Sequence, residues 1–323
     1  MIRNLLACLC ISFSLCMCTN KESKTSTAPV ISFVTVEPGV KLELLDWGGK
    51  GEPILFLAGL GNTAHVFEEY APQFTDEYHV MAVTRRGFGA SSQPGAGYDA
   101  GTLTKDILTL IDSLKIERIT LIGHSIAGEE MTKFAGLYPA RVRKLVYLDA
   151  AADRTEIGVL LAKAPPMPKM KTEDSASISA AQKFMQRVYG ISVSESELRA
   201  GCVFTKEGRF VKDITADSTY EAILKAIEKP NYKAIQAPAL SFYAVPDSVR
   251  DMVKFYDELD SAGRNSAMDL FTFFQADNRK QIAKFKAEMI AGQVVELHRA
   301  HHYVFVSNPK EVTDGIRKFL KEK

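Results

Sequence analysis

The segment Gly123-His124-Ser125-Ile126-Ala127-Gly128 decides the fold of this 323-residue chain. It lies between an apolar run at Arg118–Ile122, typical of a strand, and a run with helical periodicity at Ile126–Leu137. A sharp strand-to-helix turn strains the backbone of its central serine, so the residues two before and two after must be small. Here they are glycine and alanine. The spacing predicts that Ser125 is a nucleophile presented at the end of a strand.

Apolar runs alternate with helical patterns on both sides of this turn. We expect strands at Ser32–Glu37, Lys41–Trp47, Pro53–Ala58, Val80–Thr84, Lys144–Leu148, Pro238–Ala244 and Gln293–Leu297, and helices at Ala64–Phe74, Thr102–Leu114 and Pro309–Lys321. Strand–helix–strand alternation on this scale implies a mostly parallel sheet with helices on both faces.

The pattern changes between residues 153 and 233. A proline-rich piece, Pro165-Pro166-Met167-Pro168, precedes helix-like stretches rich in Ser, Lys and Glu, and no run typical of a buried strand follows. We interpret 153–233 as a helical cap inserted into the sheet domain. The first part of that domain is then 31–152 and the second part 234–323.

Three further motifs stand in a recognisable order around the serine. Gly59-Leu60-Gly61 follows a strand, Arg85-Arg86-Gly87-Phe88-Gly89 follows the next, and Tyr138-Pro139 precedes a third. Together with the serine turn they resemble the α/β-hydrolase fold superfamily, in particular serine esterase-like bacterial members that carry a cap. The resemblance runs from about residue 53 to 320. It implies an α/β fold with a mostly parallel central sheet, flanking helices and an inserted helical cap.

The resemblance also implies a catalytic base and acid after the nucleophile in the chain. His302 precedes an apolar stretch and Pro309, which starts the last helical pattern, so His302 is the expected base and His301 the alternative. Asp247 follows a late strand and is the expected acid. Asp149 ends an earlier strand, where some members of the superfamily carry their acid, and stays the alternative.

The glycine loop and the serine turn imply an oxyanion hole formed by the backbone N–H groups of Leu60 and Ile126. The activity this implies is hydrolysis of a carboxylic ester of a small or medium apolar molecule through an acyl-enzyme on Ser125. A serine at this position argues against the haloalkane dehalogenase and epoxide hydrolase branches, which use aspartate. Carbon–carbon bond hydrolysis, acyl transfer and a non-catalytic binding role on the same fold remain open.

The N-terminus is typical of an export signal. Arg3 precedes an apolar stretch, Leu5–Met17, then Cys18 and a polar tether at 19–30. The arrangement resembles a bacterial lipoprotein signal at 1–18, with Leu15 in the usual −3 position and Cys18 as the lipidated residue. It implies an exported protein, tethered to a membrane or periplasmic. An ordinary secretory signal or an uncleaved anchor remains the alternative.

The charge balance excludes some classes of partner. Forty Lys and Arg residues face 39 Asp and Glu residues, which gives a formal charge of +1 and no indication of nucleic-acid binding. Four of the five cysteines precede residue 19, so they form no disulfide framework. No cysteine–histidine spacing typical of zinc and no phosphate loop occurs, and the sequence implies no metal or organic cofactor. It leaves the oligomeric state open.

Overall fold

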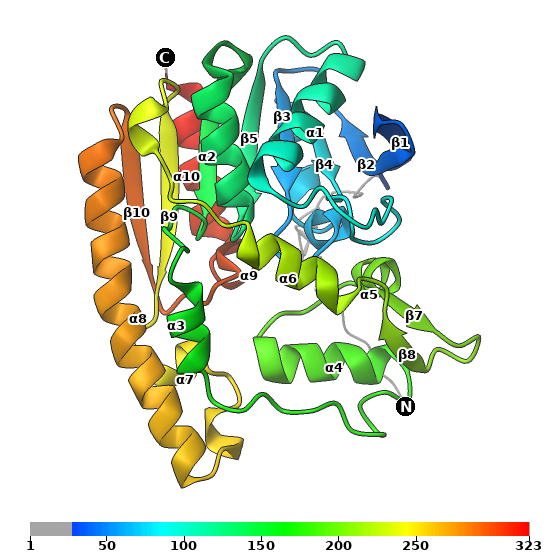
Figure 1. Ribbon diagram of the computed structural model, residues 1–323, viewed down its shortest axis with the longest axis vertical. Coiled ribbons are helices and arrows are strands. Elements are labelled where there is room, and N and C mark those ends of the chain that lie inside the picture. The colour runs from blue at the N-terminus through cyan, green and yellow to red at the C-terminus, as the bar shows by residue number, and fades with distance from the viewer. Residues whose placement is uncertain (1–27, 323) are drawn as a thin grey trace, which may run out of the picture.

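An eight-stranded sheet organises the structure, a computed structural model that describes residues 28–322 (Figure 1). Its strand order is β1-β2-β4-β3-β5-β6-β9-β10. The β1–β2 and β2–β4 pairs are antiparallel, and all the other pairs are parallel. The strands are β1 (Val30–Glu37), β2 (Val40–Gly48), β3 (Pro53–Leu57), β4 (His79–Val83), β5 (Ile119–His124), β6 (Val142–Leu148), β9 (Ala239–Val245) and β10 (Gly292–His298).

Helices cover both faces of this sheet because its central strands are apolar on both sides. Leu55 and Leu57 of β3 belong to the apolar core on one face, which α1, α2 and α8 cover, and the intervening Phe56 belongs to the core on the other face, which α9 and α10 cover. The helices are α1 (Ala100–Ser113), α2 (Ala127–Leu137), α8 (Ser261–Glu288), α9 (Val304–Ser307) and α10 (Pro309–Lys321). The expected fold class, an α/β fold with a mostly parallel sheet, is confirmed.

One expected helix is wrong. The stretch Ala64–Phe74 forms two short 3-10 helices, η1 (Ala64–Phe67) and η2 (Ala71–Phe74), instead of one α-helix. Pro72 stands in the first turn of η2, where its missing N–H and its ring prevent a continuous helix from the preceding turn. The apolar side chains still reach the core: Phe67 and Phe74 are fully buried against Phe56.

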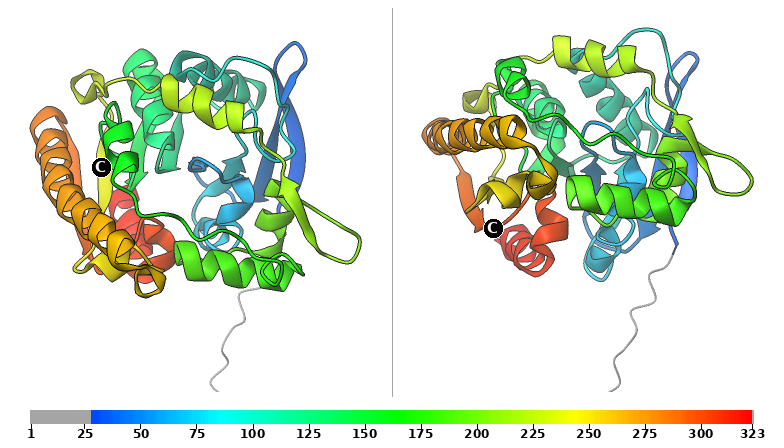
Figure 2. Two further views of the ribbon diagram at one scale, coloured as in Figure 1. Left: turned by 60° about the horizontal axis from the view of Figure 1, so that its bottom comes forward. Right: turned by 90° about the horizontal axis from the view of Figure 1, so that it is seen from below.

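The segment between β6 and β9 leaves the sheet domain and lies for most of its length beyond the carboxyl ends of the parallel strands, before Tyr232 returns to the core of the sheet domain beside Phe285 (Figures 1 and 2). It contains α3 (Ile157–Ala162), α4 (Ile178–Tyr189), α5 (Glu195–Gly201), α6 (Asp217–Lys225), the 3-10 helix η4 (Tyr232–Ala234) and a hairpin of β7 (Cys202–Phe204) and β8 (Phe210–Asp213). The prediction of an all-helical cap therefore missed this hairpin, whose three- and four-residue strands are too short to give a clear period-2 pattern.

The cap is completed by residues from the second part of the sheet domain. Phe184 and Val188 of α4 share a small core with Val249 of α7 (Val249–Met252) and with Ala267 in the first half of α8. The 3-10 helix η5 (Tyr256–Glu258) lies between α7 and α8. The cap thus has its own apolar support from the stretch of chain that follows β9.

The predicted signal at 1–18, its Cys18 and most of the tether at 19–30 lie outside the described residues. Within 28–322, no helix combines the length and apolar character needed to cross a membrane.

Candidate active site

The serine turn has the geometry that its sequence predicts. Ser125 follows β5 with φ of 56°, a left-handed conformation that is strained for a residue with a side chain. A Cβ on Gly123 would lie 2.1 Å from Met131 Sδ and 3.1 Å from the Ala127 Cβ. Both positions must therefore be small for the turn to close, and the turn presents Ser125 at the amino end of α2.

His302 lies against this serine. Its Nε2 is 2.7 Å from Ser125 Oγ, and its Nδ1 is 2.7 Å from Asp149 Oδ2. With the proton on Nδ1, the ring donates to the carboxylate and accepts from the serine hydroxyl. The sheet places the three residues together because Ser125 follows β5, Asp149 follows the adjacent strand β6, and the loop after β10 carries His302.

The structure does not bring Asp247, the expected acid, to this site. Asp247 lies past the end of β9, two strands from β5, where Oδ1 is 3.0 Å from His298 Nδ1 and Oδ2 is 3.4 Å from Arg299 Nε. The hydrogen bond from His298 lowers the pKa of this exposed carboxyl. The preference for Asp247 is corrected in favour of Asp149, whose strand is the neighbour of β5.

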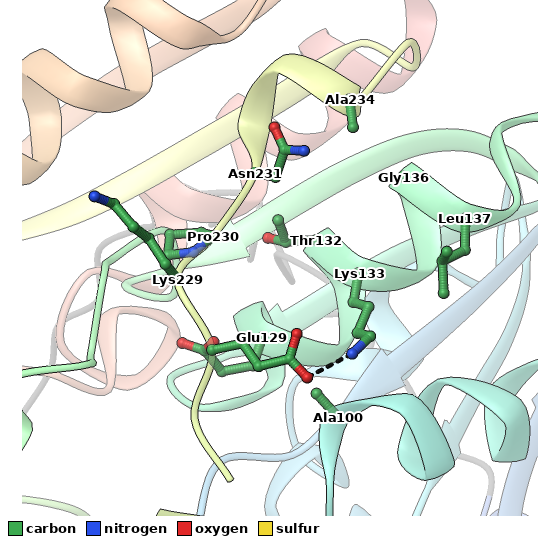
Figure 3. A pocket seen from close by; sticks show the side chains of 11 residues that line it. Ala100, Glu129, Thr132, Lys133, Gly136, Leu137, Lys229, Pro230, Asn231 and Ala234 are labelled. Atoms are coloured by element: carbon green, nitrogen blue, oxygen red, sulfur yellow. Dashed lines mark hydrogen bonds and ion pairs between the residues drawn. The ribbon is translucent and has the colours of Figure 1, made fainter.

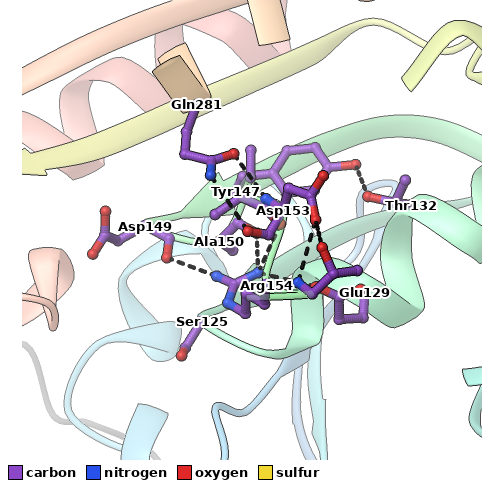
Figure 4. A network of polar contacts seen from close by, with 12 residues as sticks. Ser125, Glu129, Thr132, Tyr147, Asp149, Ala150, Asp153, Arg154 and Gln281 are labelled. Carbon is purple, nitrogen blue, oxygen red and sulfur yellow. Dashed lines mark hydrogen bonds and ion pairs between the residues drawn. The ribbon is translucent and has the colours of Figure 1, made fainter. Parts of the chain in front are cut away.

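Asp149 is held from several sides. Its φ of 51° turns the side chain toward His302, and its Oδ1 accepts the Ala244 N–H at 3.0 Å. The guanidinium of Arg154 donates to the carbonyls of Ala150 and Asp149 at 3.0 and 3.4 Å and to Glu129 at 3.3 Å (Figure 4). Burial raises the pKa of Glu129 to about 7, against the opposing effect of Arg154. This network fixes the loop that carries the acid.

The expected oxyanion loop follows β3 and faces the serine turn. A Cβ on Gly59 would lie 2.7 Å from His124 Nδ1 and 3.2 Å from Ser125 Cβ, so only glycine allows this approach. The loop closes through a hydrogen bond from the Asn62 N–H to the Gly59 carbonyl at 3.2 Å. Within residues 28–322, the N–H groups of Leu60 and Ile126 have no intramolecular hydrogen-bond partner. Both donors are thus free for a ligand oxygen.

The segment Arg85-Arg86-Gly87-Phe88-Gly89 holds the start of the oxyanion loop through Arg85. Arg85 donates to the Ala58 carbonyl at 2.9 Å and forms an ion pair with buried Glu130. Arg86 is fully buried and binds Asp106 through two hydrogen bonds, at 2.6 and 2.5 Å. These contacts give the motif a structural role.

His301, the alternative base, lies beside the triad without contacting the serine. Its Nδ1 accepts the Tyr303 N–H at 3.2 Å. Burial lowers the pKa of His301 to about 4, helped by the nearby positive charge of Lys254. His301 therefore stabilises the conformation of the loop that carries His302.

Sequence reasoning did not single out His124, Asn62 or the cap residue Glu197. His124 is buried beside Ser125 and its Nε2 is 3.0 Å from the His302 carbonyl oxygen, which makes it a donor to the histidine loop. Burial lowers the pKa of His124 well below its usual value, so the ring stays neutral. For His124, the sequence did contain a signal, because a histidine stands at the end of a largely apolar strand. Glu197 had none, because its partners are more than 130 positions away.

A cavity of about 270 Å³ lies elsewhere, along the outer face of α2 (Figure 3). Its lining includes Glu129, Asn231 and the ion pair of Lys133 with Glu228, whose polar atoms are 2.5 Å apart. None of Ser125, Asp149 and His302 lines it. Across the described part of the chain, no cluster of three or more His, Cys, Asp or Glu side chains has the arrangement of a metal site.

Comparisons with known proteins agree with this architecture. Residues 52–191 match a family model described as the alpha/beta hydrolase fold. The 2-(acetamidomethylene)succinate hydrolase of Mesorhizobium japonicum is 35% identical over 101 residues, which is 31% of this chain and 36% of that protein. The non-heme chloroperoxidase of Streptomyces lividans is 34% identical over 120 residues, which is 36% of this chain and 44% of that protein. The matched segments thus span less than half of these relatives.

Solved structures match over a greater length. The crystal structure of E-2-(acetamidomethylene)succinate hydrolase superposes with a TM-score of 0.67 at 18% identity, covering 91% of this chain and 100% of that one. The carboxylesterase CesB of Bacillus subtilis gives a TM-score of 0.56 at 16% identity, covering 91% and 92%. At these identities the likeness concerns the fold alone.

Proposed function

Because this chain has the α/β-hydrolase fold and residues 52–191 match the family model of that fold, we propose that it is a serine hydrolase that cleaves carboxylic esters of small or medium apolar substrates. The observation that carries the proposal is the continuous pair of 2.7 Å contacts from Ser125 through His302 to Asp149. A nucleophile, a base and an orienting carboxylate in this order are the requirements for acyl transfer through serine.

The geometry supports a two-step reaction. As Ser125 Oγ attacks the ester carbonyl carbon, His302 Nε2 takes the serine proton, and Asp149 stabilises the imidazolium that forms. The N–H groups of Leu60 and Ile126 donate to the oxyanion of the tetrahedral intermediate. Collapse breaks the bond to the alcohol, which leaves with the proton from His302. Water then attacks the acyl-enzyme by the same path and releases the carboxylic acid.

The first experiment tests the nucleophile. Protein lacking residues 1–18 is treated with a fluorophosphonate probe, and the labelled residue is located by mass spectrometry. We expect one covalent adduct on Ser125 and none in Ser125→Ala. A folded wild-type protein that stays unlabelled would contradict the serine-hydrolase proposal and favour a non-catalytic binding role.

A second experiment tests the substrate class. The same protein is assayed with p-nitrophenyl esters of graded acyl length, with and without an added alcohol as acyl acceptor. Release of free acid supports ester hydrolysis. Transfer of most of the acyl group to the alcohol identifies an acyltransferase instead, and labelling by the probe without turnover of any ester favours carbon–carbon bond hydrolysis.

We further propose that the protein is exported and tethered by a lipid on Cys18. Support comes from the sequence, in which a short apolar stretch, a cysteine and a polar run precede the first described residue. Expression of the full chain in a bacterium should give a membrane-bound form with the added mass of acyl chains. Cys18→Ala should remove that mass. An unmodified, freely secreted wild-type protein would contradict the tether.

A further inference from the structure

One carboxylate of the cap is buried inside the sheet domain, next to the oxyanion loop. Glu197 belongs to the short helix α5 and is only 5% exposed. Its Oε1 accepts the Asn62 side-chain N–H and the Thr63 backbone N–H, each at 3.0 Å, and its Oε2 accepts the Thr63 hydroxyl. A carboxylate removed from water needs such donors, and all three come from the end of a single loop.

These contacts restrain the loop that carries Leu60. The Asn62 backbone N–H donates to the Gly59 carbonyl and closes the turn. Both the nitrogen and the oxygen of the Asn62 side-chain amide also form hydrogen bonds. Glu197 accepts from the Asn62 amide nitrogen, and the Tyr303 hydroxyl donates to the Asn62 amide oxygen at 3.0 Å. Tyr303 directly follows His302. The chain of contacts therefore runs from the cap through the oxyanion loop to the loop of the proposed base.

A second cap residue beside Glu197 makes a different contact. The Ser196 hydroxyl donates to Glu68, which lies after η1 and outside the loop 59–63. Ser196 thus helps to attach α5 to the sheet domain without contacting the oxyanion loop. Variants of these two neighbouring residues therefore test two roles separately: Ser196 attaches the cap, and Glu197 supports the oxyanion loop.

We propose that Glu197 is a positioning residue for the oxyanion hole, so that the cap holds residues 59–63 in the conformation that catalysis requires. The inference rests on the proposed serine hydrolase function. It assigns the cap a part in stabilising the transition state. Loss of this support misplaces an oxyanion donor, which lowers transition-state stabilisation and leaves ground-state binding intact.

The test compares Glu197→Ala with Glu197→Gln and Ser196→Ala on a p-nitrophenyl ester, with active sites counted by the fluorophosphonate probe. We expect Glu197→Ala to lower kcat about 100-fold while KM changes less than about threefold. Glu197→Gln keeps an oxygen that can accept from Asn62 and Thr63, so it should retain kcat within about fivefold. Ser196→Ala should retain kcat within about twofold.

A boronic acid inhibitor, which forms a tetrahedral adduct with the serine, provides an independent readout. Its affinity should fall in Glu197→Ala by the same factor as kcat/KM, and the affinity for the carboxylate product should not. If Glu197→Ala does not fold, Asn62→Ala removes the same link from the other side and should lower kcat about tenfold at constant KM.

The outcomes distinguish the two proposals. An active wild type whose kcat per active site is unchanged by Glu197→Ala overturns this inference alone. An equal loss in Ser196→Ala and Glu197→Ala also overturns it, because the effect then belongs to cap attachment. A wild type without probe labelling or ester turnover overturns the proposed function and this inference with it.

Discussion

His302 Nδ1 lies 2.7 Å from a carboxylate oxygen of Asp149, and Asp149 and Ser125 directly follow two adjacent strands, β6 and β5. The order along the chain is therefore serine, acid, cap and histidine. Because the cap begins a few residues after Asp149, the acid lies at the start of the segment that leaves the sheet domain. Arg154, which binds both this loop and α2, fixes the acid at the base of the cap.

The first prediction separates the two candidate acids. Asp149→Asn should lower kcat about 10³- to 10⁴-fold, because the amide favours the wrong tautomer of His302 and does not stabilise its imidazolium. Asp247→Asn should keep kcat within about twofold, since the Asp247 carboxylate pairs with the exposed side chains of His298 and Arg299. The measurement is ester turnover per active site, and a larger loss in Asp247→Asn than in Asp149→Asn would reverse the assignment.

The second prediction concerns two glycines of the same helix. A Cβ on Gly128 would lie 2.0 Å from the Ala150 carbonyl oxygen, which is backbone and cannot move aside freely. Gly128→Ala should therefore lower the free energy of unfolding by about 3 kcal/mol or more.

Gly136, near the end of α2, provides the matched control. A Cβ there meets only the Ala234 Cβ, at 3.3 Å, and alanine is the better helix former by about 1 kcal/mol. Gly136→Ala should leave stability within about 1 kcal/mol of the wild type in urea denaturation. Equal stability of the two variants would contradict a close approach of α2 to the loop that follows β6.

The third prediction tests the buried neighbour of the nucleophile. His124→Phe keeps a ring beside His302 and Tyr303, whose ring centroids each lie 4.6 Å from the His124 ring centroid, but removes the donor to the His302 carbonyl. Loss of that bond should lower kcat about tenfold and the free energy of unfolding by about 1–2 kcal/mol. Unchanged kcat in a folded variant would show that the histidine loop holds its position without this contact.

The fourth prediction concerns pH. Burial by itself lowers the pKa of His65, but hydrogen bonds to Glu43 and Glu68 outweigh it and raise the pKa to about 9. The folded state thus holds a proton that the unfolded chain releases near pH 6.5. The resulting stability is fully present below pH 6.5 and is lost as pH rises toward 9, by an amount on the order of 3 kcal/mol.

His65→Gln is the matched variant for this prediction. It lacks the titrating group, so its free energy of unfolding should change less than that of the wild type between pH 6.5 and 9. Urea denaturation at several pH values measures the difference. Parallel curves for the two proteins would contradict a protonated His65 in the folded state.

The sequence predicted most strands and the serine turn because these features are local. Gly123 and Ala127 must be small because larger side chains would collide within the serine turn itself. The final helix at Pro309–Lys321 begins at a proline that suits its first turn. The hairpin β7–β8 and the break at Pro72 were missed because short strands and 3-10 turns leave weak periodic signals.

The sequence by itself determined the fold class, the turn around Ser125 and the position of His302 before the last helix. Only the tertiary structure decided between Asp149 and Asp247 and placed Glu197 on the oxyanion loop. The physical reason is that these choices depend on which strand lies next to β5 and on where a cap segment returns to the sheet. Each joins residues more than 130 positions apart, and no local pattern encodes a contact at that separation.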